Sequence, residues 1–165
     1  MYGSLTRKKW ILMGVGVPVL FALWWAFRPE KLWINQKVDE PAPFTSVAGP
    51  QPLYTGTLQA KAHPTSGRAT IFKAPSGVDY LRLTDFQTSN GPDVHVVLAR
   101  GDDQNLGHEI VKGQFDSVEL GALKGNEGDQ NYDVASSVDL NKYDTVVIYC
   151  ERFHAIFGEA RLEPF

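Results

Sequence analysis

The pattern of apolar and polar residues divides the chain into three parts. Residues 10–27 form one uninterrupted apolar run, residues 28–52 carry repeated prolines, and residues 53–165 alternate apolar with polar positions over short segments. Alternation with a period of two is typical of β-strands that bury one face. The pattern therefore predicts one apolar helix, a connecting segment and a β-rich domain.

The apolar run over residues 10–27 predicts a membrane anchor. Its 18 residues would form a helix about 27 Å long, which just reaches across the hydrocarbon core of a bilayer. A cleaved signal peptide and a buried core helix are the alternatives. No small-residue cleavage site follows the run, and the run is long for a signal core. We therefore expect one retained transmembrane helix, with the lipid bilayer as the partner of residues 10–27.

The charges beside this run predict its orientation. Arg7, Lys8 and Lys9 precede it with no acid beside them, which favours a cytoplasmic location for residues 1–9. Arg28 and Lys31 on the far side weaken this bias. The expected location is the cell membrane, single-pass, with the C-terminal domain extracytoplasmic.

The segment over residues 28–52 predicts a linker. Five prolines lie in it, and they prevent a long helix and favour extended, semi-rigid chain. The domain expected to follow, over residues 53–165, is long enough to bury one core.

The pattern over residues 53–165 predicts an all-β fold. Glycine, proline, aspartate or asparagine separates most of the candidate strands. Short strands at this spacing, with no convincing helix pattern after the anchor, indicate an antiparallel β-sandwich or a partly open barrel. The candidate strands are Thr55–Ala60, Arg68–Lys73, Tyr80–Thr84, Val94–Leu98, Val118–Leu120, Thr145–Cys150 and Glu159–Glu163.

The charge of this domain excludes one class of partner. Residues 53–165 carry ten of the 16 basic residues and sixteen of the 19 acidic ones, which gives a net charge of −6. Phosphate backbones require clustered basic side chains, so we expect no nucleic-acid partner. Anionic lipid headgroups would repel the domain, which leaves membrane attachment to residues 10–27.

The single cysteine, Cys150, lies at the end of a strongly apolar candidate strand. Exported domains usually pair their cysteines or lack them, so a lone thiol is either protected by burial or kept for chemistry. Strand alternation places Cys150 on one apolar face with Val146 and Ile148. Two interpretations stay open: an inert thiol inside the core, or a redox thiol near basic side chains at a strand end.

Three loops carry polar residues that could contact a ligand. Residues 90–93 predict a hairpin corner capped by Asp93, or a rigid loop that presents Asp85 or Asp93 to a ligand. His63 precedes a proline that orients its backbone, and is either bonded to a loop carbonyl or a metal, haem or redox-site ligand. Residues 123–132 predict a plain surface turn, with a pocket lined by Lys124 or Tyr132 as the alternative.

No cofactor or metal motif is evident. The four histidines and the cysteine lack the spacing of metal-binding motifs, and no nucleophile elbow, phosphate-binding loop or dinucleotide fingerprint occurs in the domain. His95 shares a strand face with Asp93 and is predicted to be a solvent-side strand residue. The sequence therefore indicates no metal ligand, and a stand-alone enzyme is not expected.

A set of short motifs occurs in order along the domain. They are His63 with Ser66–Gly67, Leu83-x-Asp85-Phe86, Gly91–Val94 with Leu98, Leu123–Gly125, Gly128 with Gln130-x-Tyr132, Val147–Ile148-x-Cys150-x-x-Phe153 and Phe157–Gly158-x-Ala160-x-Leu162. Together they resemble the DM-thirteen domain family over nearly all of residues 53–163, in a form that carries the domain alone behind an N-terminal anchor. The resemblance implies an extracytoplasmic β-sandwich-type domain with an electron-transfer role centred on its cysteine, here Cys150.

Two hypotheses follow for the function. In the first, the chain is a membrane-anchored electron-transfer or thiol-redox module with Cys150 as the reactive atom. Because a lone cysteine cannot form an internal disulfide, its redox partner would be a separate envelope protein. In the second, the chain is a non-catalytic ligand- or protein-binding β-sandwich of the cell envelope, with Cys150 buried and structural.

Overall fold

The computed structural model describes residues 16–22, 24–25, 34–43, 49–74, 78–101 and 116–165. The chain forms two compact units, Met1–Ile34 and Asn35–Phe165. The second unit contains all the described strands. Its range, from Asn35 to Phe165, also includes Cys150 and every candidate ligand-binding residue.

The first unit contains helix over residues 16–22 and 24–25. Its large side chains are exposed and apolar, among them Leu20, Phe21 and Trp25. Among the described residues, no helix is long and apolar enough to cross a membrane. Residues 1–9, predicted to be cytoplasmic, and much of the predicted anchor lie outside the described residues.

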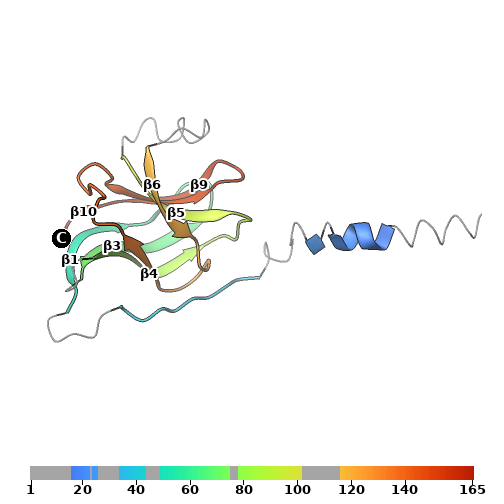
Figure 1. The fold of residues 1–165 in the computed structure, drawn as a ribbon, viewed down its shortest axis with the longest axis horizontal. Coiled ribbons are helices and arrows are strands. Elements are labelled where there is room, and N and C mark those ends of the chain that lie inside the picture. The colour runs from blue at the N-terminus through green and yellow to red at the C-terminus, as the bar shows by residue number, and fades with distance from the viewer. Residues whose placement is uncertain (1–15, 23, 26–33, 44–48, 75–77, 102–115) are drawn as a thin grey trace, which may run out of the picture. The chain divides into compact units, whose positions relative to one another are not determined.

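The second unit is an antiparallel β-sandwich, as predicted, with two sheets face to face (Figure 1). One sheet has the strand order β10-β1-β3-β4-β7 and the other the order β2-β9-β8-β5-β6. Neighbouring strands in both sheets are antiparallel. The strands are β1 Gln51–Thr57, β2 Gln59–Ala60, β3 Thr65–Lys73, β4 Asp79–Thr88, β5 Val94–Ala99, β6 Ser117–Ala122, β7 Gln130–Val134, β8 Thr145–Cys150, β9 Ala155–Arg161 and β10 Glu163–Pro164.

The main hydrophobic core takes side chains from both sheets. Ile71 and Leu81 of the first sheet and Val96 and Ile148 of the second are fully buried in it. A second, smaller cluster includes Val97 and Val147, which lie on the other face of β5 and β8. β8 is therefore buried along its whole length on both faces.

Two predictions from turn chemistry were wrong. Residues 89–93 do not close a hairpin, because β4 and β5 belong to different sheets and this segment crosses between them. The predicted surface turn over residues 123–132 ends at Asp129, since β7 begins at Gln130 and places Gln130 and Tyr132 in buried positions. In both segments the bend is present, but the turn residues did not indicate where the next strand begins or which sheet it joins.

Candidate functional site

Cys150 lies at the last position of β8, with 0% of its surface exposed. Its register partners are Val94 on β5 and Ala155 on β9. Val146, Ile148 and Cys150 all belong to the main core cluster, so the predicted sharing of one face is confirmed. A thiol in this position packs as a small hydrophobic side chain and meets no solvent.

His63 packs against Phe157, an aromatic residue of the same core. Its imidazole and the ring of Phe157 have centroids 3.9 Å apart and planes tilted by 34°. Gly91 lies on the same ring, because a Cβ at this position would collide with Phe157 and with Val94. Val94 is the register partner of Cys150, so these packing contacts link His63 to the strand pair that carries the thiol.

Asp93 forms a hydrogen bond with His95, which lies on the face of β5 opposite the main core. Its Oδ1 lies 3.1 Å from His95 Nε2, and Glu119 Oε1 lies 2.7 Å from His95 Nδ1. Glu151 Oε2 is 3.8 Å from the same Nε2. The side chain of His95 is only 17% exposed, so this predicted solvent-side residue is mostly enclosed by carboxylates.

These carboxylates set the protonation of His95. Partial burial lowers the pKa of His95, but hydrogen bonds and charge from Asp93 and Glu119 outweigh it and raise this pKa above its ordinary value of 6.5. The protonated form of His95 is therefore more stable here than in an isolated imidazole.

Asp85 lies at an irregularity between β3 and β4. Its φ of 50° is unusual for a residue other than glycine, and the register shifts opposite it between Ser66 and Arg68. Its backbone amide donates to Asp129 Oδ1 at 2.9 Å. Asp85 is exposed and lies on β4, whereas Asp93 directly precedes β5 of the other sheet.

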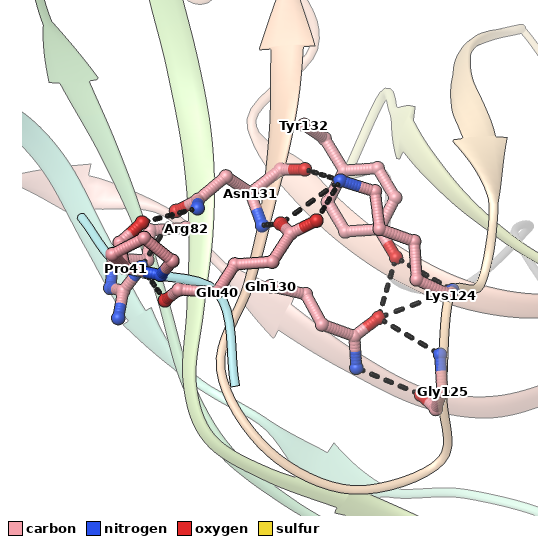
Figure 2. Close-up of polar contacts among 8 residues, drawn as sticks. All are labelled: Glu40, Pro41, Arg82, Lys124, Gly125, Gln130, Asn131 and Tyr132. Atoms are coloured by element: carbon pink, nitrogen blue, oxygen red, sulfur yellow. Dashed lines mark hydrogen bonds and ion pairs between the residues drawn. The ribbon is translucent and has the colours of Figure 1, made fainter. Parts of the chain in front are cut away.

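Lys124 is engaged by residues 35–41, which we call the strap. Its Nζ donates to both carboxylate oxygens of Glu40, at 2.8 and 3.0 Å, and to the carbonyl oxygen of Asn131 at 2.6 Å (Figure 2). Two backbone amides of the strap also donate to carbonyls of the loop over residues 123–129, at 2.9 and 2.8 Å. The strap therefore occupies the surface beside Lys124.

Two glycines make room for the strap. A Cβ at Gly125 would collide with the carbonyl oxygen of Gln36, and one at Gly128 would collide with that of Val38. Gly128 also has a φ of +94°, which side-chain-bearing residues rarely adopt. Both glycines are thus required by the close approach of the strap backbone.

A buried glutamine holds the loop from the inside. Gln130 is 0% exposed, and its Oε1 accepts hydrogen bonds from the amides of Lys124 and Gly125 and from the hydroxyl of Tyr132 (Figure 2). Its Nε2 donates to the carbonyl of Gly125 at 2.8 Å. Burial raises the pKa of Tyr132 to about 12, so the phenol stays protonated and remains a donor.

The five candidate residues do not form one site. Asp93 and Cys150 lie at adjoining ends of β5 and β8, and His63 is linked to them through Phe157. Lys124 lies in the loop over residues 123–129 and bonds to the strap, and the backbone amide of Asp85, on β4, donates to Asp129 of the same loop. The sequence did not predict that Glu119 and Glu151 are neighbours of His95. The alternation of Asp93 and His95 was the one available signal for this cluster. Glu119 and Glu151 come close to His95 only because β5 pairs with β6 and β8.

A comparison with protein families decides the identity of the domain. A family model described as Electron transfer DM13 matches residues 57–162. The chain belongs to this family. No curated protein and no solved structure matches it. The match confirms the resemblance to the DM-thirteen family, and the description of the family indicates electron transfer as the general role.

The structure explains several motifs of the DM13 family in this chain. Lys124, Gly125, Gly128, Gln130 and Tyr132 all belong to the network that fixes the loop and receives the strap. Their contacts are within the chain, which gives this motif a structural role. Among the other motifs, those with Val94 and Leu98 and with Val147, Ile148 and Cys150 lie on or beside the paired strands β5 and β8.

Proposed function

We propose that this chain is a membrane-anchored, extracytoplasmic electron-transfer module. The match to the DM13 family over residues 57–162 carries the proposal. Exposed apolar side chains on the helix over residues 16–22 and 24–25 support the anchor, because such a surface is stable in lipid and costly in water. Protease added to intact cells should digest residues 53–165; a domain that stays intact until the cells are lysed would contradict this location.

In the first form of the proposal, Cys150 is the redox atom. Its thiolate would attack a disulfide of an envelope partner, form a mixed disulfide and release the other partner sulfur as a thiolate. Because the thiol is 0% exposed, this step requires the end of β8 to open locally, where Cys150 pairs with Val94 and Ala155. Local opening of this kind has a free-energy cost that slows the reaction.

The complete burial of Cys150 favours a second candidate. In this form the chain is a non-catalytic binding module of the envelope and the thiol only fills the core. The two forms differ in how fast the thiol reacts in the folded protein.

Thiol labelling separates the two forms. The folded chain is treated at neutral pH with an aromatic disulfide reagent, with and without denaturant, and release of the coloured thiolate is followed. If Cys150 is the redox atom, labelling in buffer should be complete within minutes and should accelerate in Phe157→Ala, which removes a large side chain from the core cluster that contains Cys150. A thiol that labels only after global unfolding would instead support the structural role.

A further inference from the structure

Four side chains converge on the outer face of the second sheet. Asp93 directly precedes β5, His95 lies near its start, Glu119 comes from β6, and Glu151 follows β8 directly. The backbone amide of Glu151 donates to the carbonyl of Asp93 at 2.9 Å, which fixes the two segments together. β5 lies between β6 and β8, so residues distant in sequence meet here.

An irregularity in β6 aims Glu119 at the imidazole. His95 pairs with Ala122, but Val97 pairs with Glu119, so the register shifts by one residue between them. Gly121 has a φ of +140° at this position. Such bulges are used in proteins to redirect a side chain. Here the bulge brings Glu119 Oε1 to 2.7 Å from His95 Nδ1.

The other nitrogen of His95 faces two carboxylates. Asp93 Oδ1 and Glu151 Oε2 lie 3.1 and 3.8 Å from Nε2, and one ligand atom from each of the three residues lies within 4.8 Å of the others. Ligand atoms bound at about 2.1 Å to one ion are about 3.0 to 3.4 Å apart at octahedral or tetrahedral angles. Glu151 is 65% exposed, so its side chain can move the remaining distance without repacking the core.

The charge around this imidazole is unbalanced. Three carboxylates surround one histidine, and within the described part of the chain no lysine or arginine forms an ion pair with Asp93, Glu119 or Glu151. These four described side chains therefore keep an excess negative charge even when His95 is protonated. A doubly charged cation would neutralise it.

We propose that Asp93, His95 and Glu151 bind a divalent transition-metal ion. One imidazole nitrogen with two carboxylate oxygens suits Mn²⁺, Fe²⁺ and Zn²⁺. Glu119 is the positioning residue: it accepts the proton of Nδ1 and leaves the lone pair of Nε2 directed at Asp93 and Glu151, the usual arrangement behind a metal-bound histidine. The site is separate from the core face that carries Cys150, so metal binding does not depend on the proposed thiol chemistry.

Metal binding by the full chain in detergent solution tests the proposal. Mn²⁺ is titrated and followed by electron paramagnetic resonance, in which the free ion gives a six-line signal that broadens on binding, and Zn²⁺ is titrated by calorimetry. We expect one saturable site per chain. Glu151→Gln and His95→Gln should each weaken binding by more than tenfold, and Glu119→Gln by about 10-fold to 100-fold.

The controls keep this test interpretable. Glu163→Gln removes an exposed carboxylate on β10 and should leave the affinity unchanged. Glu151 is exposed in the turn after β8, so its variant is expected to fold, and its circular dichroism spectrum should match that of the unmodified chain. Absence of a saturable site, or equal affinity in Glu151→Gln and the unmodified chain, would show that the carboxylates only hold a protonated imidazole and would overturn the proposal.

Discussion

The strap region and the carboxylate cluster at His95 use the same residue types in opposite ways. At the strap, Glu40 meets Lys124, and Asp129 meets Arg82 at 2.6 Å. At the outer face of β5, three carboxylates share one imidazole. The charges at the strap are matched by opposite charges of the chain, whereas the three carboxylates at His95 have no lysine or arginine partner among the described residues and have the composition of a site for an external cation.

The two regions also differ in how tightly their residues are held. The strap is bound by backbone hydrogen bonds and by close contact with Gly125 and Gly128, so it cannot shift without losing many contacts. The His95 cluster is closed on one side by the exposed and movable side chain of Glu151. A binding site needs such an accessible side, and a structural network does not.

The largest expected effect comes from breaking the fit of the strap. Gly128→Ala places a Cβ against the carbonyl oxygen of Val38 and forces a side chain into a φ of +94°. We expect a loss of about 2 kcal/mol in the free energy of unfolding, measured in urea. Trypsin should also cleave after Lys37 faster in the folded variant, because the strap is displaced.

Gly49→Ala is the matched control for this variant. Gly49 also has a positive φ, of +55°, but nothing lies within 4 Å of the position where its Cβ would be. Gly49→Ala therefore introduces backbone strain without a steric clash, and cleavage after Lys37 should not change. Equal cleavage rates in the two variants would mean that the strap does not depend on the close approach at Gly128.

A smaller effect is expected from the strap carboxylate. Glu40→Gln removes a partly exposed ion pair with Lys124, which should lower the free energy of unfolding by about 0.5 to 1 kcal/mol at neutral pH. Partial burial raises the pKa of Glu40, but hydrogen bonds from Lys124 and Asn131 outweigh it and hold this pKa below its ordinary value of 4.5. The contribution of Glu40 is thus fully present above pH 4.5 and is lost as the pH falls through its folded pKa.

Urea unfolding of both proteins across this pH range provides the measurement. The difference in unfolding free energy between the unmodified chain and Glu40→Gln should shrink steadily below pH 4.5. Glu163→Gln, an exposed residue of β10, should show a difference near zero at neutral pH. A difference for Glu40→Gln that stays constant down to pH 3 would argue against the ion pair as its cause.

Much of the fold follows from sequence periodicity. The strand Thr145–Cys150 is observed with its predicted bounds, and alternation alone placed Cys150 on the face of Val146. β7 was missed because Gln130, a polar residue, occupies an inward position after a run of turn residues. Only its hydrogen bonds to the loop make that burial favourable, and those depend on tertiary structure.

The candidate sites were less predictable, because they depend on pairing between distant segments. Prolines indicate extended chain over residues 28–52, but not that Gln36 would bond to Asn126, which is 90 residues away. Likewise, the alternation of Asp93 and His95 is visible in the sequence, whereas the approach of Glu151 requires the pairing of β5 with β8. Periodicity defines faces, and partners across strands are defined by topology.

The smallest effect is expected at the His95 cluster, and it sharpens the contrast with Glu40. Glu151→Gln removes an attraction to His95 at 3.8 Å, but it also removes repulsion from Asp93 and Glu119 in the same cluster. These terms oppose each other at an exposed position, so without added metal the free energy of unfolding should change by less than about 0.5 kcal/mol. With 1 mM Zn²⁺, by contrast, the unmodified chain should gain thermal stability and the variant should not, because a ligand that binds only the folded state stabilises it by mass action. If Glu151→Gln proved as destabilising as Glu40→Gln in metal-free buffer, Glu151 would be a structural carboxylate of the same kind, and the distinction between the two regions would fail.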